Sequence, residues 1–144
     1  MTQINRRRGT ACFPGWMAER RKPDPDRVVL IVDDDAAVLT SLTFALEVEG
    51  YVVRAYSGPS EILAAPDLPE AGCLVVDYNL PAMNGLALFE HLRSAGALVP
   101  GILITSDPGI QLRRRAAESG LLIVEKPLLG TSLVDAIRAA FAAG

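Results

Sequence analysis

The sequence predicts an α/β fold in which five parallel strands form a doubly wound sheet with five helices on its two faces. The main observation is a repeated alternation of short apolar runs, rich in β-branched residues, with segments that have the apolar period of a helix. The length of 144 residues is that of one domain. Half of the residues are hydrophobic and 22% are charged, which is typical of a globular domain and excludes a disordered chain.

The apolar runs predict where the strands lie. Residues 28–32 form a continuous run of Val, Leu and Ile, as expected of a strand that is buried on both faces. Residues 51–56 form the second strand, and Arg54 within it indicates a position at the edge of the sheet. The other three strands are predicted at residues 73–76, 101–104 and 121–124.

Five helices follow the strands. The first covers residues 36–49, where apolar residues recur at helical spacing until Gly50 ends the helix. The last begins at a cap formed by Thr131 or Ser132 and runs to Phe141. The remaining three are predicted at residues 59–65, 85–94 and 110–119.

Residues 1–27 are expected to be a basic, flexible arm before a domain that covers residues 28–144. The net charge of −3 combines an excess of four positive charges in the arm with an excess of seven negative charges in the domain. An acidic domain argues against direct contact with nucleic acid. No apolar stretch is long enough for a membrane span or a secretory signal, so membrane insertion is not expected. The distant pair Cys12 and Cys73 forms no disulfide framework, which fits a cytoplasmic protein.

Residues that carry chemistry collect where the apolar runs end. Three aspartates at positions 33–35 follow the first run, Asp77 follows the third, Thr105 the fourth and Lys126 the fifth. Parallel strands bring these ends together, and ligands of such sheets bind beyond them. Clustered carboxylates need a cation, and oxygen ligands without His or Cys favour Mg²⁺ before Ca²⁺. Lysine and threonine fit the oxygens of a phosphoryl group, and a carboxylate can accept that group. We therefore expect a Mg²⁺-dependent aspartyl phosphate.

The four motifs at these ends resemble the receiver domain of two-component response regulators. They are VDDD at residues 32–35, VDYNLPAMNG at 76–85, ITS at 104–106 and EKP at 125–127. All four occur in the family's order, and the resemblance covers about residues 28–143. It implies the flavodoxin-like strand order 2-1-3-4-5 that chemotaxis receivers adopt.

The resemblance also implies a role for each motif residue. Asp77 would be the phosphoacceptor, Thr105 would bind a phosphoryl oxygen, and Lys126 would pair with the phosphoryl group. Gly85 would let the loop after the acceptor turn into the next helix. The ligands of Mg²⁺ would be three carboxylates and one main-chain carbonyl, from Asp33, Asp34, Asp77 and Asn79 respectively.

The family's partners follow from the same resemblance. A sensor histidine kinase or a histidine phosphotransferase would supply the phosphoryl group, as in a phosphorelay. The chain would not be an enzyme beyond its own phosphorylation and dephosphorylation. Because the sequence ends directly after the last helix, we expect a receiver without an output domain that signals by protein–protein contact. The expected surface is helix 110–119, strand 121–124 and the last helix, facing a downstream target or a second copy in a homodimer.

One position departs from the family pattern. In many receivers an aromatic residue lies three positions before the lysine of the fifth strand, whereas this chain has Ile123. We therefore expect that the signal does not depend on the inward turn of an aromatic ring.

Two other interpretations stay open. A haloacid-dehalogenase-type phosphatase also forms an aspartyl phosphate, and residues 33–37 match the acids of its D-x-D-x-T/V motif with Asp33 as nucleophile. Ala37 departs from the last position of that motif, and Asp77 would have no role. A degenerate receiver would instead bind partners without phosphorylation. Taken singly, the acids after the first strand could merely cap a helix, a role for which Asp35 is suited.

Overall fold

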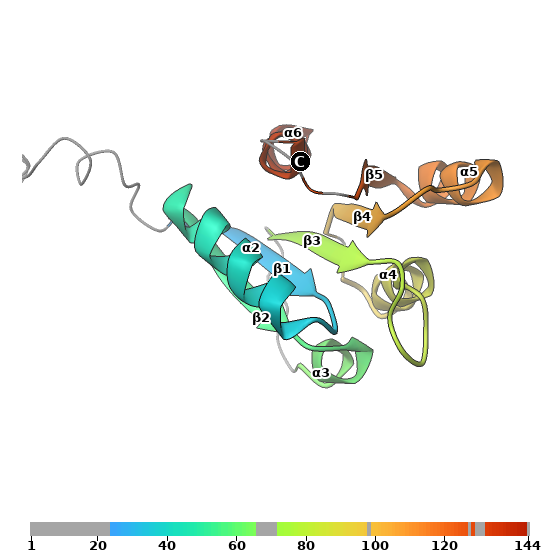
Figure 1. The fold of residues 1–144 in the computed structure, drawn as a ribbon, viewed down its shortest axis with the longest axis horizontal. Coiled ribbons are helices and arrows are strands. Elements are labelled where there is room, and N and C mark those ends of the chain that lie inside the picture. The colour runs from blue at the N-terminus through green and yellow to red at the C-terminus, as the bar shows by residue number, and fades with distance from the viewer. Residues whose placement is uncertain (1–23, 66–71, 98, 127, 129–131, 144) are drawn as a thin grey trace, which may run out of the picture.

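The computed structural model describes residues 24–65, 72–97, 99–126, 128 and 132–143, which form a parallel sheet between two layers of helices (Figure 1). The strands are β1 (Asp24–Val32), β2 (Tyr51–Tyr56), β3 (Gly72–Asp77), β4 (Gly101–Thr105) and β5 (Leu121–Glu125). The helices are α2 (Ala36–Val48), α3 (Pro59–Leu63), α4 (Gly85–Ser94), α5 (Ile110–Ser119) and α6 (Ser132–Ala143).

The strand order is β2-β1-β3-β4-β5, and every neighbouring pair is parallel. This confirms the expected doubly wound order and the position of β2 at an edge of the sheet. Val32 of β1 pairs with Tyr56 on one side and with Val76 on the other, while Thr105 pairs with Glu125. The register therefore brings the carboxyl ends of all five strands to one edge.

Alternation along the central strands divides the core into two layers. On β1, Leu30 faces the layer covered by α3, α4 and α5, while Ile31 faces the layer covered by α2 and α6 (Figure 1). Both residues are at most 1% exposed. Because the central strands are buried on both faces, their sequences are continuous apolar runs without polar alternation.

The main difference from the predicted elements lies at the start of β1. The strand begins at Asp24, four residues before the apolar run, and Asp24 pairs with Tyr51. The register shifts between Asp24 and Val28, so this extension is joined to the regular ladder through an irregularity. A hydrophobic pattern cannot predict such an extension, because backbone pairing and not side-chain burial forms it.

Local signals define most helix ends as expected. The Asp35 carboxylate accepts hydrogen bonds from the N–H groups of Ala37 (2.9 Å) and Val38 (3.4 Å) and so caps α2. Gly50, just beyond this helix, has a φ of 96°, which an L side chain rarely adopts. Ser132 is the first residue of α6, and Thr131, the alternative cap, lies outside the described residues. Within the described part of the chain, no helix has the length and apolar character needed to cross a membrane.

Candidate functional site

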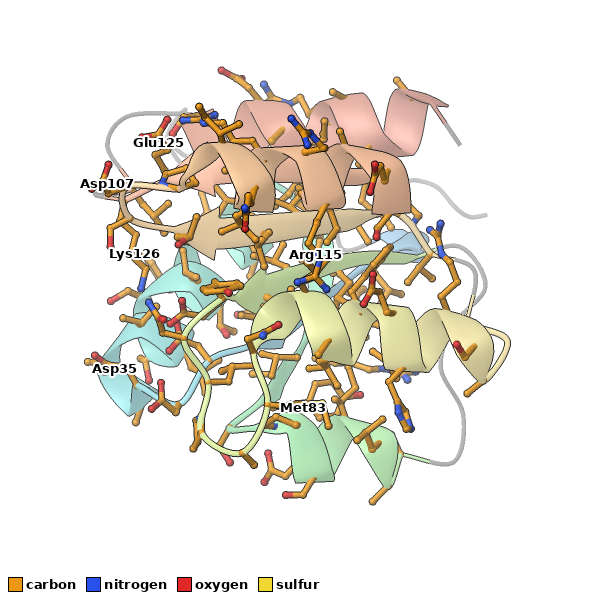
Figure 2. All side chains as sticks on the ribbon, turned by 90° about the vertical axis from the view of Figure 1, so that its right-hand side faces the viewer. Asp35, Met83, Asp107, Arg115, Glu125 and Lys126 are labelled. Carbon is orange, nitrogen blue, oxygen red and sulfur yellow. The ribbon has the colours of Figure 1, made fainter. Side chains whose placement is uncertain are left out.

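The polar residues predicted to act together lie at the carboxyl edge of the sheet. Asp33 follows β1, Asp77 and Thr105 are the last residues of β3 and β4, and Lys126 follows β5. The Asp33 N–H donates to the carbonyl of Tyr56 (3.2 Å), and the Lys126 N–H donates to the carbonyl of Thr105 (2.9 Å). Sheet-like bonding therefore continues just past the strand ends and holds the site residues in place. Figure 2 shows Asp35, Asp107, Glu125 and Lys126 at this same end of the molecule.

Burial separates the acids of the site. Asp33 and Asp77 are only 3% and 5% exposed, and Thr105 is 3% exposed, whereas Asp34 is exposed. Buried carboxylates are costly unless they are paired or bind a cation. Burial of the Asp33 and Asp77 carboxylates at the edge of the sheet therefore destabilises the folded protein in the absence of a bound cation.

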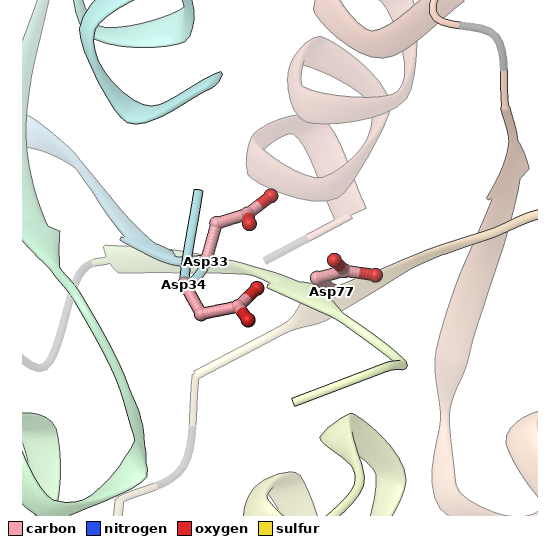
Figure 3. Close-up of side chains that lie close together, drawn as sticks. All are labelled: Asp33, Asp34 and Asp77. Carbon is pink, nitrogen blue, oxygen red and sulfur yellow. The ribbon is translucent and has the colours of Figure 1, made fainter. Parts of the chain in front are cut away.

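Three carboxylates form a cluster at this edge. One oxygen from each of Asp33, Asp34 and Asp77 lies within 4.8 Å of the other two (Figure 3). Asp33 and Asp34 are consecutive on the chain, while Asp77 comes from the neighbouring strand, and Figure 3 shows the three side chains together. A donor set of carboxylate oxygens without His or Cys fits a hard divalent cation such as Mg²⁺.

Hydrogen bonds orient two of these carboxylates. Oδ1 of Asp33 accepts from the N–H of Asp35 (2.9 Å), and Oδ1 of Asp77 accepts from the N–H of Asn79 (3.2 Å). The other oxygen of Asp77, Oδ2, lies 3.2 Å from Nζ of Lys126. Asp77 thus has one oxygen held by the backbone and one facing a cation.

The pKa of Asp33 reflects the charges of the residues around it. Burial raises the pKa of this carboxyl above its usual range, and the hydrogen bond from Asp35 opposes that effect. The neighbouring Asp77 carboxylate also raises this pKa, Lys126 lowers it, and Asp34 raises it further. The carboxylates therefore repel one another, and a single lysine offsets this repulsion in part.

Gly85 lies where the loop after the predicted acceptor turns into α4, as the family resemblance implies. The positive φ in this loop falls on Ala82, at 73°, so Gly85 is not there for an unusual φ. A Cβ atom at Gly85 would instead lie 2.5 Å from the carbonyl oxygen of Asp77 and 2.9 Å from a methyl carbon of Leu103. Gly85 is therefore required because α4 begins directly against the backbone of the predicted acceptor.

The remaining predicted residues lie at or near the site, and they are held by fewer hydrogen bonds or are exposed to solvent. Among the described residues, the Thr105 hydroxyl donates one long hydrogen bond, 3.4 Å, to the carbonyl of Ser106. Asn79 is exposed, and the role of its main-chain carbonyl stays a prediction. Asp107, in the loop after β4, is exposed and has a φ of 51°, which Asp tolerates better than most residues.

Sequence reasoning missed an apolar cavity beside the carboxylates. It has a volume of about 540 Å³, and its lining joins apolar side chains to site residues: Asp33, Val38, Ile104, Ser106, Lys126 and Leu128. The sequence gives no signal for it, because the lining comes from separate segments of the chain.

The strand order, together with an acidic cluster at the carboxyl edge, is typical of the receiver class of signalling domains. A family model described as "Response regulator receiver domain" matches residues 29–138. The chain belongs to this family, whose members are signalling phosphoacceptors and not classical enzymes.

Individual relatives agree with this family. The response regulator protein TmoT of Ectopseudomonas mendocina is 31% identical over 129 residues, which cover 89% of this chain and 59% of that protein. The transcriptional regulatory protein FixJ of Rhizobium meliloti (strain 1021) is 34% identical over 117 residues, covering 80% of this chain and 57% of that protein. The chain thus spans less than two thirds of the length of these curated relatives.

Solved structures agree as well. The crystal structure of FixJ-N matches with a TM-score of 0.72 and 34% identity, covering 83% of this chain and 96% of that one. A CheY-like receiver domain protein from Methanospirillum hungatei JF-1 matches with a TM-score of 0.73 and 27% identity, covering 81% of this chain and 94% of that one.

Proposed function

We propose that this receiver accepts a phosphoryl group from a sensor histidine kinase or a histidine phosphotransferase onto Asp77. The observation that carries the proposal is the surroundings of the Asp77 carboxylate. It is 5% exposed, it lies in a cluster with two further carboxylates, and its Oδ2 is 3.2 Å from the Lys126 ammonium. A buried carboxylate held at a strand end has the fixed position that in-line transfer requires.

The neighbouring side chains support a division of roles. An oxygen of Asp77 attacks the phosphorus atom while the bond between phosphorus and the donor breaks. The Lys126 ammonium pairs with the phosphoryl oxygens as negative charge develops on them. The Thr105 hydroxyl, which makes only a weak hydrogen bond, is available to bind another of these oxygens.

The carboxylate cluster is the proposed magnesium site. Asp33, Asp34 and Asp77 would hold the ion, with the main-chain carbonyl of Asn79 as a fourth protein ligand. When bound, Mg²⁺ would neutralise the clustered acids and polarise the phosphoryl group. The mutual repulsion of these acids supports this proposal, because a divalent cation relieves it.

The phosphatase alternative assigns different roles to the same acids. It makes Asp33 the nucleophile and requires a catalytic function of the second acid of its motif, Asp35. The Asp35 carboxylate is instead exposed and caps α2 through two N–H groups. This observation favours the receiver, as does the cluster that includes Asp77.

The test is phosphorylation of the full chain with acetyl phosphate and Mg²⁺. Mass spectrometry of peptides should find one phosphoryl group per chain, on Asp77, and Asp77→Asn should abolish it because an amide is a poor nucleophile. Asp35→Asn is the matched control, because asparagine caps a helix as well as aspartate and phosphorylation should continue. Label on Asp33, or loss of activity in Asp35→Asn, would support the phosphatase. A chain that acquires no label would be a degenerate receiver.

The signalling route is also part of the proposal. The surface formed by α5, β5 and α6 would contact a downstream protein or a second copy of the chain, in the cytoplasm and without direct contact to nucleic acid.

A further inference from the structure

The carboxyl-terminal end of α5 is fastened to α4 by a group of polar contacts. The Arg93 guanidinium of α4 donates to the carbonyl of Ser119, the last residue of α5 (3.2 Å), and to the carbonyl of Val99 before β4 (3.5 Å). The same guanidinium lies over the ring of Phe89, 4.6 Å from its centroid. The Ser119 hydroxyl donates to the Glu90 carboxylate of α4 (3.0 Å). Two helices and the segment before β4 therefore meet at one arginine.

The core beneath this end of α5 leaves little room for movement. Phe89, which lies under the Arg93 guanidinium, is buried, and so is Leu121, two residues after the end of α5. A Cβ atom at Gly101, the first residue of β4, would lie 2.6 Å from the ring of Phe89 and 2.5 Å from a methyl carbon of Leu121. The carboxyl-terminal end of α5 is therefore next to tightly packed side chains as well as hydrogen-bonded.

The amino-terminal end of α5, which follows the loop that contains Asp107, has weaker contacts (Figure 2). Its N-cap, Gly109, has no side chain that could accept a hydrogen bond, and its first residue, Ile110, is 77% exposed. The ion pair of Arg113 with Glu125 joins this end to β5, but both side chains are about half exposed, and such pairs contribute little stability. The helix is therefore held firmly at one end and loosely at the other.

Glu125 links the loosely held end of α5 to the proposed phosphoacceptor site. It is the residue before Lys126, whose Nζ lies 3.2 Å from Asp77. Its partner Arg113 donates its main-chain N–H to the carbonyl of Gly109 (3.0 Å), where the helical hydrogen bonds of α5 begin. A change at the site therefore reaches the first turns of α5 before it reaches the end that Arg93 holds.

We propose that Arg93 is the fixed point of α5, about which the first turns of the helix, residues 110–115, move when Asp77 is phosphorylated. This inference rests on the proposed function, and it names the part of the signalling surface that changes. Arg93 is a positioning residue, because it acts by holding the far end of α5. A partner that distinguishes the two states would contact the surface around Ile110 and Arg113, since the surface at residues 117–119 stays in place.

Amide hydrogen exchange of the unphosphorylated full chain measures the two ends of α5 separately. The amides of residues 113–115 should exchange faster than those of residues 117–119, by about tenfold or more, because the helix opens from its loosely held end. The first three N–H groups of α5 make no hydrogen bond within the helix and are left out of the comparison. Equal rates at the two ends, or faster exchange at residues 117–119, would overturn the proposal and leave the proposed function intact.

Two arginine variants test whether Arg93 holds the end of α5. Arg93→Gln removes the hydrogen bonds to two carbonyls and should speed exchange at residues 117–119 by about fivefold or more, with less change at residues 113–115. Arg115→Gln is the matched control, because Arg115 also lies between α4 and α5 (Figure 2), but its ion pair with Glu90, at 3.8 Å, is too long for a hydrogen bond. The same change in both variants would overturn the proposal. So would an equal rise in exchange over the whole sheet in Arg93→Gln, because Arg93 would then add only general stability.

Beryllofluoride, a mimic of the phosphoryl group, tests the movement when it is added with Mg²⁺. In the wild type, changes in amide NMR signals should be largest from Ser106 to Arg115 and should decrease toward Ser119. In Arg93→Gln they should stay large through Ser119, because the far end is then free to move. Changes of equal size along the whole of α5 in the wild type, or the same profile in the variant, would overturn the proposal. If beryllofluoride changed no signal around Asp77, the proposed function itself would fail, and the proposed movement with it, whatever hydrogen exchange showed about Arg93.

Discussion

At the scale of single residues, a substitution of Asp34 distinguishes a role in metal binding from a role in helix capping. Asp35 caps α2 and Asp33 is buried, whereas Asp34 is exposed and is not the residue that caps the helix. Its position in the carboxylate cluster costs the apo protein some repulsion, because like charges destabilise one another. A residue that costs stability and lies in a cation-sized cluster is expected to be there for function.

We predict that Asp34→Ala weakens Mg²⁺ binding by about tenfold or more and slows phosphorylation. Without Mg²⁺, the variant should be slightly more stable than the wild type, by about 0.5 kcal/mol, because one like charge is removed. Titration calorimetry and urea unfolding in EDTA would measure the two effects. Asp107→Asn removes an exposed charge outside the cluster and is the control, with unchanged Mg²⁺ affinity. The same affinity in Asp34→Ala would show that Asp34 is not a ligand.

Cys73 is a buried thiol in the middle of the sheet. It is 0% exposed, and burial raises its pKa from 9.0 to about 12. The folded protein therefore keeps this proton at a pH at which the unfolded chain loses it. The corresponding stability is fully present below about pH 9 and is lost as the pH rises from there toward 12.

We predict that Cys73 does not react with thiol reagents at pH 8 while the protein is folded. In a Cys12→Ser background, its labelling should be slower than that of a free thiol by about a thousandfold or more, because the thiolate is the reactive form. Relative to Cys73→Ala, the wild type should lose stability above about pH 9, by about 1.4 kcal/mol per pH unit. Rapid labelling of the folded protein would contradict the burial of this side chain.

At the scale of elements, α5 is a helix that contributes few side chains to the core. Only Ala116 of this helix is fully buried. Arg113 pairs with Glu125 of β5 at 2.8 Å, but both side chains are about half exposed, and such pairs contribute little stability. At its far end, the carbonyl of Ser119 accepts a hydrogen bond from Arg93 of α4 (3.2 Å). The helix is therefore able to shift at small cost in free energy.

We predict that phosphorylation is transmitted through α5 and the loop before it, without an aromatic switch. Ile123 is partly buried against the core layer under α3, α4 and α5, and its β-branched side chain has few rotamers in a strand. Binding of beryllofluoride, which mimics a phosphoryl group, should shift amide NMR signals from Ser106 to Ser119. Large shifts confined to α2 and α3 would show that the signal leaves by another face.

At the scale of the whole molecule, charge is distributed unevenly along the chain. Residues 1–27 have an excess of four positive charges, and the rest has an excess of seven negative charges. The family model starts at residue 29, so the receiver itself is the acidic part. Among the residues that the structure describes from Asp24 onward, the two core layers begin with Val28 and Val29.

We predict that deletion of residues 1–16 leaves phosphorylation by acetyl phosphate and the melting temperature nearly unchanged, because this segment has few apolar residues. Calorimetry and the phosphorylation rate of the shortened chain would be compared with those of the full chain. A melting temperature lower by several degrees would mean that Phe13 or Trp16 packs on the domain.

The sequence by itself determined the fold and its family. Each strand is a local apolar run and each helix a local period, and both are properties of neighbouring residues that need no coordinates. The acids, the hydroxyl and the lysine were also recognisable, because parallel strands must bring their carboxyl ends together. The order of the strands, the edge position of β2 and the cap formed by Asp35 are confirmed.

Only the tertiary structure decided what depends on distances between separate segments. It brought oxygens of Asp33, Asp34 and Asp77 within 4.8 Å of one another and extended β1 to Asp24 through backbone pairing. It also showed that Gly85 is required by the closeness of the Asp77 carbonyl, which no turn signal reveals. The cavity beside the carboxylates is of the same kind, because a cavity exists only where side chains from different elements leave a space unfilled.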